Sequence, residues 1–197
     1  MMLSLSRNIP EADKSVKGSA WNRKQFTGVE VYKKNLGVMG LGKIGSHVAT
    51  VALSLGMNVL AYDPFISKER AAELGCNLVD PDLLFQEADY ITLHIPKTSE
   101  TAHLINAEAL AKMKPTARIV NCARGGIIDE AALAKALTDG VIAGAALDVY
   151  SAEPLGESPL RDVDKSLVLT PHLGASTAEA QVHVAVDVAE QIRDVLL

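Results

Sequence analysis

Several kinds of residue are scarce in this sequence of 197 residues, and each scarcity excludes a class of protein. Cysteine occurs only at Cys76 and Cys122, with no Cys or His at ligand spacing, so neither a disulfide framework nor a metal site is expected, and a reducing cytoplasm is favoured. Aromatic residues make up 4% of the chain, and 24 acidic side chains outnumber 19 basic ones, which argues against a nucleic-acid partner. No apolar run approaches the roughly 20 residues of a membrane span, so no membrane partner is expected.

The hydrophobic residues, 48% of the chain, are grouped in short runs that alternate with helical stretches. The apolar residues in these runs are continuous rather than alternating, which is typical of strands that are covered on both faces. Their alternation with helices predicts right-handed crossovers and an open parallel sheet around one core. The expected strands cover residues 36–40, 58–62, 90–94, 117–121, 144–149 and 167–170, and the expected helices cover 1–17, 43–56, 68–74, 107–113, 129–139 and 177–197, the last of them amphipathic.

A glycine-rich turn follows the first expected strand. Residues 40–45 read G-x-G-x-x-G where a strand ends and a helix begins, which is the setting of the dinucleotide-binding fingerprint. Gly40 would form the tight turn, Gly42 would let a pyrophosphate approach the backbone, and Gly45 would let helix and strand pack closely. The alternative is a glycine-rich turn without a ligand.

Asp63 lies at the end of the next expected strand, 18 residues beyond Gly45, where an acidic side chain binds the ribose hydroxyls of a dinucleotide. A 2′-phosphate would meet this carboxylate as a like charge, so NAD is favoured over NADP. The alternative is an Asx turn before Pro64, which would be the better interpretation if Asp63 stood alone. Together with the glycines, Asp63 favours a cofactor site.

An arginine followed by two glycines closes the expected strand at 117–121. Arg124 stays charged and presents paired donors, so it is suited to hold a substrate carboxylate rather than to transfer a proton. The alternatives are an arginine in a flexible loop or one paired with Asp129, although Asp129 is better placed to cap the helix that follows. Cys122, at the same strand end, is expected to be packed rather than reactive.

A histidine and a glutamate complete the set of candidate residues. His172 follows the last expected strand and Glu153 lies in the loop before it, and a histidine beside a carboxylate can exchange a proton near neutral pH. Either residue alone would be interpreted as an ordinary surface side chain. Placement favours a site, because the carboxyl ends of parallel strands share one edge, where ligands bind. The residues that follow strand ends are Gly40, Asp63, His94, Arg124, Asp148 and His172, of which His94 is expected to shape a loop.

These motifs resemble those of the D-isomer-specific 2-hydroxyacid dehydrogenases over essentially the whole chain. The family's marks are the glycine fingerprint, Asn-Cys-Ala-Arg-Gly-Gly at 121–126, Ala-Leu-Asp-Val-Tyr at 146–150 with Glu153-Pro154, and Pro171-His172. The run 171–177, with Glu-Ala-Gln at 179–181, resembles the phosphoglycerate branch more than the glyoxylate, lactate or formate branches. The resemblance implies a Rossmann-type doubly wound parallel sheet of the α/β class.

The resemblance also implies roles for single residues. Arg124 would hold the substrate carboxylate and carbonyl, His172 would be the acid/base, and Glu153 would orient and charge it. No metal is implied. The residues implied to bind NAD are Gly40, Gly42, Lys43, Ile44, Gly45, Asp63, Ile95, Cys122, Ala123, Arg124, Asp148, His172, Gly174 and Ala175.

Three segments are expected: an N-terminal helix and dimer arm at 1–30, an NAD-binding domain at 31–178 and a C-terminal helix at 179–197. The dimer arm, with Trp21 and Phe26, implies a homodimer or larger homo-oligomer, although both side chains could equally pack within the chain. The family's substrate-binding domain is missing from this chain, and the doubled methionine at its start is consistent with a piece of a longer protein. We therefore expect NAD binding with little or no turnover.

The activity implied by the resemblance is oxidation of 3-phospho-D-glycerate to 3-phosphohydroxypyruvate, at the start of serine biosynthesis, with NAD as the hydride acceptor. One alternative is a hydroxypyruvate or glyoxylate reductase of the same family. A second is an NADH-sensing binding protein, like the C-terminal-binding corepressors that share this fold. Both stay open, because the groups that would bind the substrate phosphate or a partner lie in the missing domain.

Overall fold

The chain folds around one parallel sheet. The computed structural model describes residues 1–164 and 166–196, and for residues 183 and 184 the backbone only. Within this part of the chain the sheet has seven parallel strands in the order β3-β2-β1-β4-β5-β6-β7, so the predicted doubly wound sheet is confirmed. The strands are β1 (Asn35–Met39), β2 (Asn58–Tyr62), β3 (Asn77–Leu78), β4 (Tyr90–Leu93), β5 (Arg118–Asn121), β6 (Gly144–Leu147) and β7 (Leu167–Leu169).

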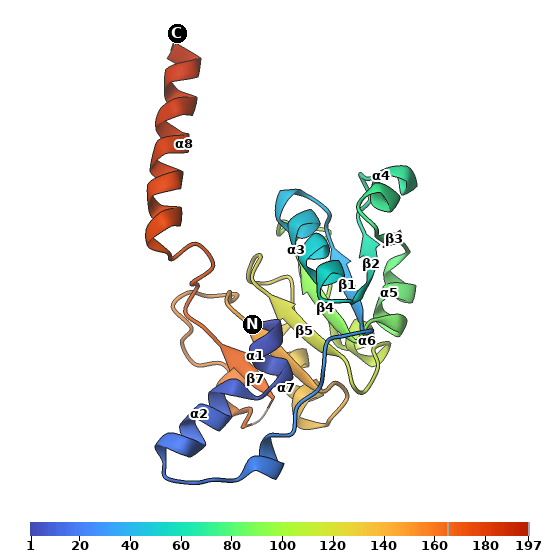
Figure 1. Cartoon of the computed structure of the whole chain (residues 1–197), viewed down its shortest axis with the longest axis vertical. Coiled ribbons are helices and arrows are strands. Elements are labelled where there is room, and N and C mark those ends of the chain that lie inside the picture. The colour runs from blue at the N-terminus through green and yellow to red at the C-terminus, as the bar shows by residue number, and fades with distance from the viewer. Residues whose placement is uncertain (165, 197) are drawn as a thin grey trace.

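Helices cover both faces of the sheet (Figure 1). α5 (Pro81–Glu87), α6 (Ala107–Ala111) and α7 (Glu130–Thr138) pack on one face. α3 (Lys43–Ser54), α4 (Lys68–Glu73) and the short α1 (Met2–Ser6) pack on the other. β1 lies between β2 and β4, so the strand order reverses there. Ligands of such sheets bind at the carboxyl ends of the strands beside this reversal.

The strands are buried on both faces because successive side chains point to opposite sides of the sheet. Ile91 and Leu93 of β4 belong to the cluster that includes α5, α6 and α7, whereas Tyr90 belongs to the opposite cluster. The hydroxyl of Tyr90 is paired with the hydroxyl of Ser6 at 2.7 Å, and Leu5 packs on the sheet next to them. α1 is therefore part of the packed domain.

The N-terminal segment forms two helices where one was predicted. α1 ends at Ser6, and α2 (Ile9–Lys17) begins after Asn8, whose φ of 52° interrupts the helix. Asparagine tolerates this left-handed conformation better than most residues. Pro10 lies in the first turn of α2, where a proline is tolerated, and Gly18 follows its last residue.

Four short elements were not predicted from the sequence. β3 pairs with β2 through two residues, too few for a hydrophobic pattern to be recognised. The sequence does contain a helix-start signal for α5, which is Asp80 followed directly by Pro81. In the structure Asp80 caps the helix, because its side chain accepts a hydrogen bond from the amide of Leu83. The remaining two are 3-10 helices at Arg23–Phe26 and Pro159–Asp162.

The C-terminal helix α8 (Ala178–Leu196) extends away from the sheet (Figure 1). The amphipathic pattern predicted this helix, and residue 197 of the prediction lies outside the described residues. Its apolar stripe is exposed, with Val182 at 60%, Ile192 at 55% and Val195 at 85% of their full accessibility. The stripe therefore has little apolar packing among the described parts of the chain. No helix in the described residues is both long and apolar enough to span a membrane.

Candidate active site at the carboxyl edge of the sheet

The glycine turn between β1 and α3 has the geometry that its sequence predicts. Gly40 has a φ of +95°, a conformation that L side chains rarely adopt. A Cβ atom on Gly45 would lie 1.9 Å from the carbonyl oxygen of Gly40. The first glycine is therefore required by the turn, and the third is required by the close approach of α3 to the turn.

The start of α3 is suited to an anion. Gly42 is the N-cap residue, and no side chain caps the helix. A Cβ on Gly42 would meet no atom within 4 Å, so the space beside it is open. The first amides of a helix have no partners within it, and they carry the positive end of the helix dipole. The amides of Lys43 and Ile44 and the open space at Gly42 therefore fit the pyrophosphate of a dinucleotide.

Asp63 joins the end of β2 to the glycine turn. Its Oδ2 accepts a hydrogen bond from the amide of Leu41 at 2.8 Å, and its Oδ1 accepts one from the amide of Phe65 at 2.9 Å. The second bond is the Asx turn that the sequence offered as the alternative, so Asp63 has this structural role. Each carboxylate oxygen keeps acceptor capacity for a ribose hydroxyl, and the turn holds the carboxylate beside the glycines.

The residues after β4 line the same turn. The amide of His94 donates to the carbonyl of Met39, and the His94 carbonyl and Ile95 Cγ2 lie against Gly40. The Nε2 atom of His94 is paired with the hydroxyl of Thr92 at 3.0 Å, and burial lowers the pKa of this imidazole. These contacts support the prediction that His94 shapes the loop, and they put Ile95 beside the glycines.

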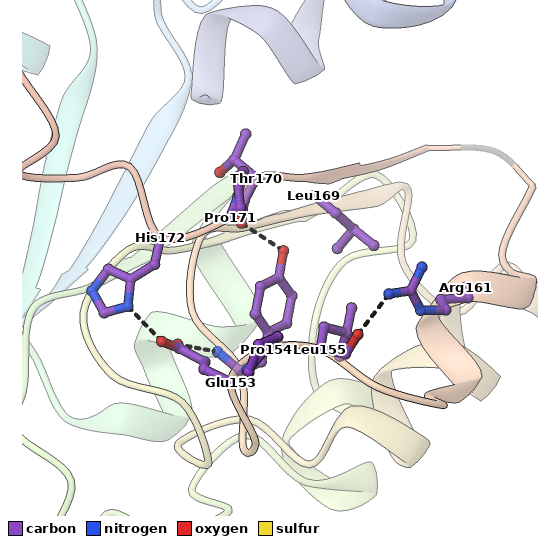
Figure 2. A pocket seen from close by; sticks show the side chains of 9 residues that line it. Glu153, Pro154, Leu155, Arg161, Leu169, Thr170, Pro171 and His172 are labelled. Atoms are coloured by element: carbon purple, nitrogen blue, oxygen red, sulfur yellow. Dashed lines mark hydrogen bonds and ion pairs between the residues drawn. The ribbon is translucent and has the colours of Figure 1, made fainter.

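His172 and Glu153 form a pair on the loops that follow β6 and β7. The Nδ1 atom of His172 lies 2.6 Å from Oε2 of Glu153. Figure 2 shows the two side chains pointing toward each other. Oε1 of Glu153 accepts a hydrogen bond from the amide of Tyr150 at 3.0 Å. The hydrogen bond with His172, followed by that from Tyr150, lowers the pKa of the Glu153 carboxyl. A carboxylate at Nδ1 fixes the orientation of the ring and leaves Nε2 to exchange a proton.

Asp148, at the end of β6, organises the loop that carries His172. Its side chain is buried and accepts hydrogen bonds from the amides of Leu173 and Gly174, both at 2.8 Å, and from the hydroxyl of Thr170. Burial raises the pKa of Asp148, but the hydrogen bonds from Thr170, Leu173 and Gly174 and the nearby His172 outweigh it, so the pKa is lowered. Nothing in the sequence around Thr170 identifies its hydroxyl as a donor to Asp148.

The lowered pKa of Asp148 predicts an effect of pH on stability. A carboxyl whose pKa is lowered by folding stabilises the protein above its ordinary pKa, about 3.9, and this stabilisation disappears as the pH falls through the folded value. Asp148→Asn should lower the free energy of unfolding by about 2 kcal/mol near neutral pH, because it loses the charge that accepts these bonds. Urea unfolding at about pH 7 and about pH 3 should show the difference shrinking in acid. An equal difference at both pH values would contradict a role for the charge.

The turn that carries Arg124 packs against the Glu153 loop. A Cβ on Gly125 would lie 1.6 Å from the carbonyl oxygen of Tyr150, so only glycine permits this contact. The guanidinium of Arg124 donates to the carbonyl of Ala123 at 2.7 Å. Asp129 caps α7 through the amides of Ala131 and Ala132, and the ion pairs of the described residues do not include an Arg124–Asp129 pair. Arg124 can therefore face an anion at this edge.

The prediction that Cys122 is packed is wrong, because its side chain is exposed. β5 ends at Asn121, so Cys122 lies just beyond the strand and beside Met1, whose sulfur is 3.2 Å from Sγ. Partial desolvation and the charge of Asp148 raise the pKa of the thiol, which agrees with low reactivity.

The predicted residues fall into two groups on one edge of the sheet. One surrounds the glycine turn and the other surrounds the His172–Glu153 pair, with Arg124 in the turn packed beside the second. Ala175 accepts a hydrogen bond from Gln181 through its carbonyl. A pocket of about 530 Å³ is lined by the His172–Glu153 pair, by Arg161 and by the residues around them, which are Tyr150, Pro154, Leu155, Leu169, Thr170 and Pro171 (Figure 2). The guanidinium of Arg161 is bound to the carbonyls of Leu155 and Gly156.

Comparison with known protein sequences identifies the family of this chain. Residues 1–174 match the family model of the D-isomer specific 2-hydroxyacid dehydrogenase, NAD binding domain. A D-3-phosphoglycerate dehydrogenase of Synechocystis sp. is 73% identical over 197 residues, which are 100% of this chain and 35% of that protein. A D-3-phosphoglycerate dehydrogenase of Mycobacterium tuberculosis is 52% identical over 193 residues, 98% of this chain and 36% of that protein. The chain thus spans 35–36% of the length of these relatives.

Solved structures share the fold at lower identity. A glyoxylate reductase from Paecilomyes thermophila matches with a TM-score of 0.89 and 34% identity, over 98% of this chain and 58% of that one. A D-lactate dehydrogenase from Aquifex aeolicus, complexed with NAD and lactic acid, matches with a TM-score of 0.88 and 30% identity, over 99% and 63%. The family match over residues 1–174 decides the assignment: this chain belongs to the D-isomer specific 2-hydroxyacid dehydrogenases and contains their NAD-binding domain.

Proposed function

We propose that this chain is the NAD-binding part of an enzyme that oxidises 3-phospho-D-glycerate to 3-phosphohydroxypyruvate, at the start of serine biosynthesis. The observation that carries the proposal is the His172–Glu153 pair, at 2.6 Å, on the same sheet edge as the glycine turn. The substrate is proposed from the names of the curated relatives, which are D-3-phosphoglycerate dehydrogenases at 52–73% identity.

The chain's own residues would divide the binding of NAD between the two groups. The glycine turn and the amides of Lys43 and Ile44 would bind the pyrophosphate, and Asp63 would bind the adenine ribose. The residues proposed for the nicotinamide end are Cys122, Ala123, Asp148, Gly174 and Ala175, with Ile95 beside the cofactor. When bound, NAD supplies a nicotinamide carbon that accepts a hydride.

In the proposed reaction the substrate loses one proton and one hydride. His172 Nε2 takes the proton of the C2 hydroxyl of the substrate, and the carbonyl bond forms as the C2 hydrogen leaves with its electron pair as a hydride. Glu153 stabilises the imidazolium that results. Arg124 binds the carboxylate with paired donors and so fixes the orientation of C2.

The choice of cofactor is tested by calorimetric titration of this chain with NADH and NADPH. We expect NADH to bind at least about tenfold more tightly, because the 2′-phosphate of NADPH would be brought against the Asp63 carboxylate. NADPH binding that is equal or tighter would contradict the role of Asp63. The absence of binding of either dinucleotide would contradict the function of the glycine turn.

The chain by itself is expected to bind NAD with little or no turnover. Its own residues would supply the acid/base, His172, and the arginine that binds the substrate carboxylate, Arg124. The groups that bind the substrate phosphate would come from another domain. Formation of NADH from 3-phosphoglycerate by this chain at a rate typical of enzymes would contradict the proposal.

A panel of 2-hydroxyacids, tested on a full-length protein that contains the chain, distinguishes a phosphoglycerate dehydrogenase from a glyoxylate or hydroxypyruvate reductase. Inactivity towards every 2-hydroxyacid in that panel would favour an NADH-sensing protein.

The segment 1–30 is proposed to contain the N-terminal helix, whose α1 part packs on the sheet, and a dimer arm, within a three-part organisation of 1–30, 31–178 and 179–197. Trp21 supports the proposal because it is 77% exposed, so it does not pack within the described residues of its own chain. An exposed tryptophan is common at protein interfaces. Light scattering of the chain and its Trp21→Ala variant tests this: a dimer that becomes monomeric supports the arm, and two monomers contradict it.

A further inference from the structure

A second carboxylate holds the loop that carries Glu153. Glu130, the first residue of α7, accepts a hydrogen bond on Oε1 from the amide of Ser151 at 2.6 Å. The preceding amide, that of Tyr150, donates to Oε1 of Glu153. Two neighbouring amides of one loop are therefore bound by two different glutamates, one of them the partner of His172.

The loop is held from the same direction by the Arg124 turn. That turn leads into α7, and the backbone of Gly125 lies against the carbonyl of Tyr150 so closely that a Cβ would collide with it. The Tyr150 hydroxyl lies 2.8 Å from the carbonyl oxygen of Thr170, to which it donates, and 3.2 Å from that of Leu147. The position of Glu153 thus depends on a loop that is held by several contacts. The contact from α7 is made by the Glu130 side chain.

Glu130 does more than occupy the favourable first turn of a helix. Glu108, an acidic residue in the first turn of α6, is paired with Lys112 of its own helix at 3.1 Å and is 78% exposed. Glu130 is instead hydrogen-bonded to a loop that is distant in sequence, and the ion pairs found in the described residues do not include it. A helix-dipole role alone requires no such contact.

We infer that Glu130 is a positioning residue for the reaction, which holds the Tyr150–Ser151 backbone so that Glu153 stays within hydrogen-bonding distance of His172. The inference rests on the proposed function for its significance, but its geometry is independent of cofactor and substrate. The reach of the side chain to the Ser151 amide matters more than its charge. Substitutions that separate these two properties therefore test the inference.

The test is an NMR titration of the Glu153 carboxyl, labelled with ¹³C, in this chain. Two variants form a matched pair: Glu130→Gln keeps an oxygen at the same reach without the charge, and Glu130→Asp keeps the charge but is one methylene shorter. Glu108→Ala is the control for loss of an acidic residue from a first helical turn. The groups around Glu153 are His172, the Tyr150 amide and Asp148, and the first two keep its pKa low in the wild type.

We expect the pKa of Glu153 to rise by about half a unit or more in Glu130→Asp, because a displaced loop weakens the hydrogen bonds to His172 and Tyr150. It should stay at its wild-type value in Glu130→Gln, which retains an acceptor oxygen at the same reach. Glu108→Ala should leave it unchanged. An unchanged pKa in Glu130→Asp, or a rise in Glu130→Gln, would overturn the inference. Because the titration requires neither NAD nor turnover, its failure is distinguishable from failure of the proposed function.

Discussion

The Gly45→Ala variant is expected to unfold at a much lower urea concentration than the wild-type chain. The new Cβ would lie 1.9 Å from the carbonyl oxygen of Gly40 and 3.0 Å from its carbon. Both atoms belong to the backbone of a tight turn, so no flexible side chain can move aside. Either α3 or the turn must shift, and we expect a loss of about 3 kcal/mol, the upper part of the range for overpacked cores. Binding of NADH should be lost with it.

Gly42→Ala is the matched control in the same turn. Its Cβ would meet no atom within 4 Å, and its φ of −63° suits alanine. We expect its stability to stay within about 0.5 kcal/mol of the wild type. Its affinity for NADH should nevertheless fall about tenfold or more, because the methyl group fills the space that a pyrophosphate needs. Equal stability of the two alanine variants would contradict the packing role of Gly45, and unchanged affinity of Gly42→Ala would contradict the placement of the phosphates.

Two structural features that the sequence predicted near the site have local signals. The glycine turn is encoded within six residues, and Asp129 stands directly before a helical stretch that it caps. The His172–Glu153 pair is not local, but it could be predicted because both residues follow strands and parallel strands end at one edge. Its distance confirms that these loops bring the two side chains together.

The parts that the sequence did not predict depend on contacts between distant segments. The bond from Ser151 to Glu130 and that from Thr170 to Asp148 each join loops whose relative position is set by the order of the strands. Neither residue type has a fixed spacing that would identify its partner. The exposure of Cys122 was not predicted because the sequence does not fix the last residue of a strand. β5 ends at Asn121, so Cys122 lies one residue beyond the strand and its side chain is exposed.

In a full-length dehydrogenase that contains this domain, His172→Asn is expected to lower kcat by about 10²–10⁴-fold, the usual effect of removing a general acid/base. Asparagine is chosen because His172 has a φ of 56°, a conformation that asparagine adopts more readily than alanine. The affinity for NADH should change by less than about tenfold, because the pyrophosphate and ribose are proposed to bind at the glycine turn and Asp63. Stopped-flow measurement of NADH formation gives kcat, and calorimetry gives the affinity.

His103→Asn is the control, because His103 has a φ of 51° and the change is chemically the same. The amide of His103 donates to the carbonyl of Gly126, a bond that asparagine retains, so kcat should stay at the wild-type value. Glu153→Gln should give an intermediate loss, since the amide oxygen can still accept a hydrogen bond from Nδ1 but carries no charge to stabilise the imidazolium. A kcat of His172→Asn close to that of the control would mean that another group takes the hydroxyl proton. In that case the Glu153–His172 contact would hold the loop without serving the chemistry.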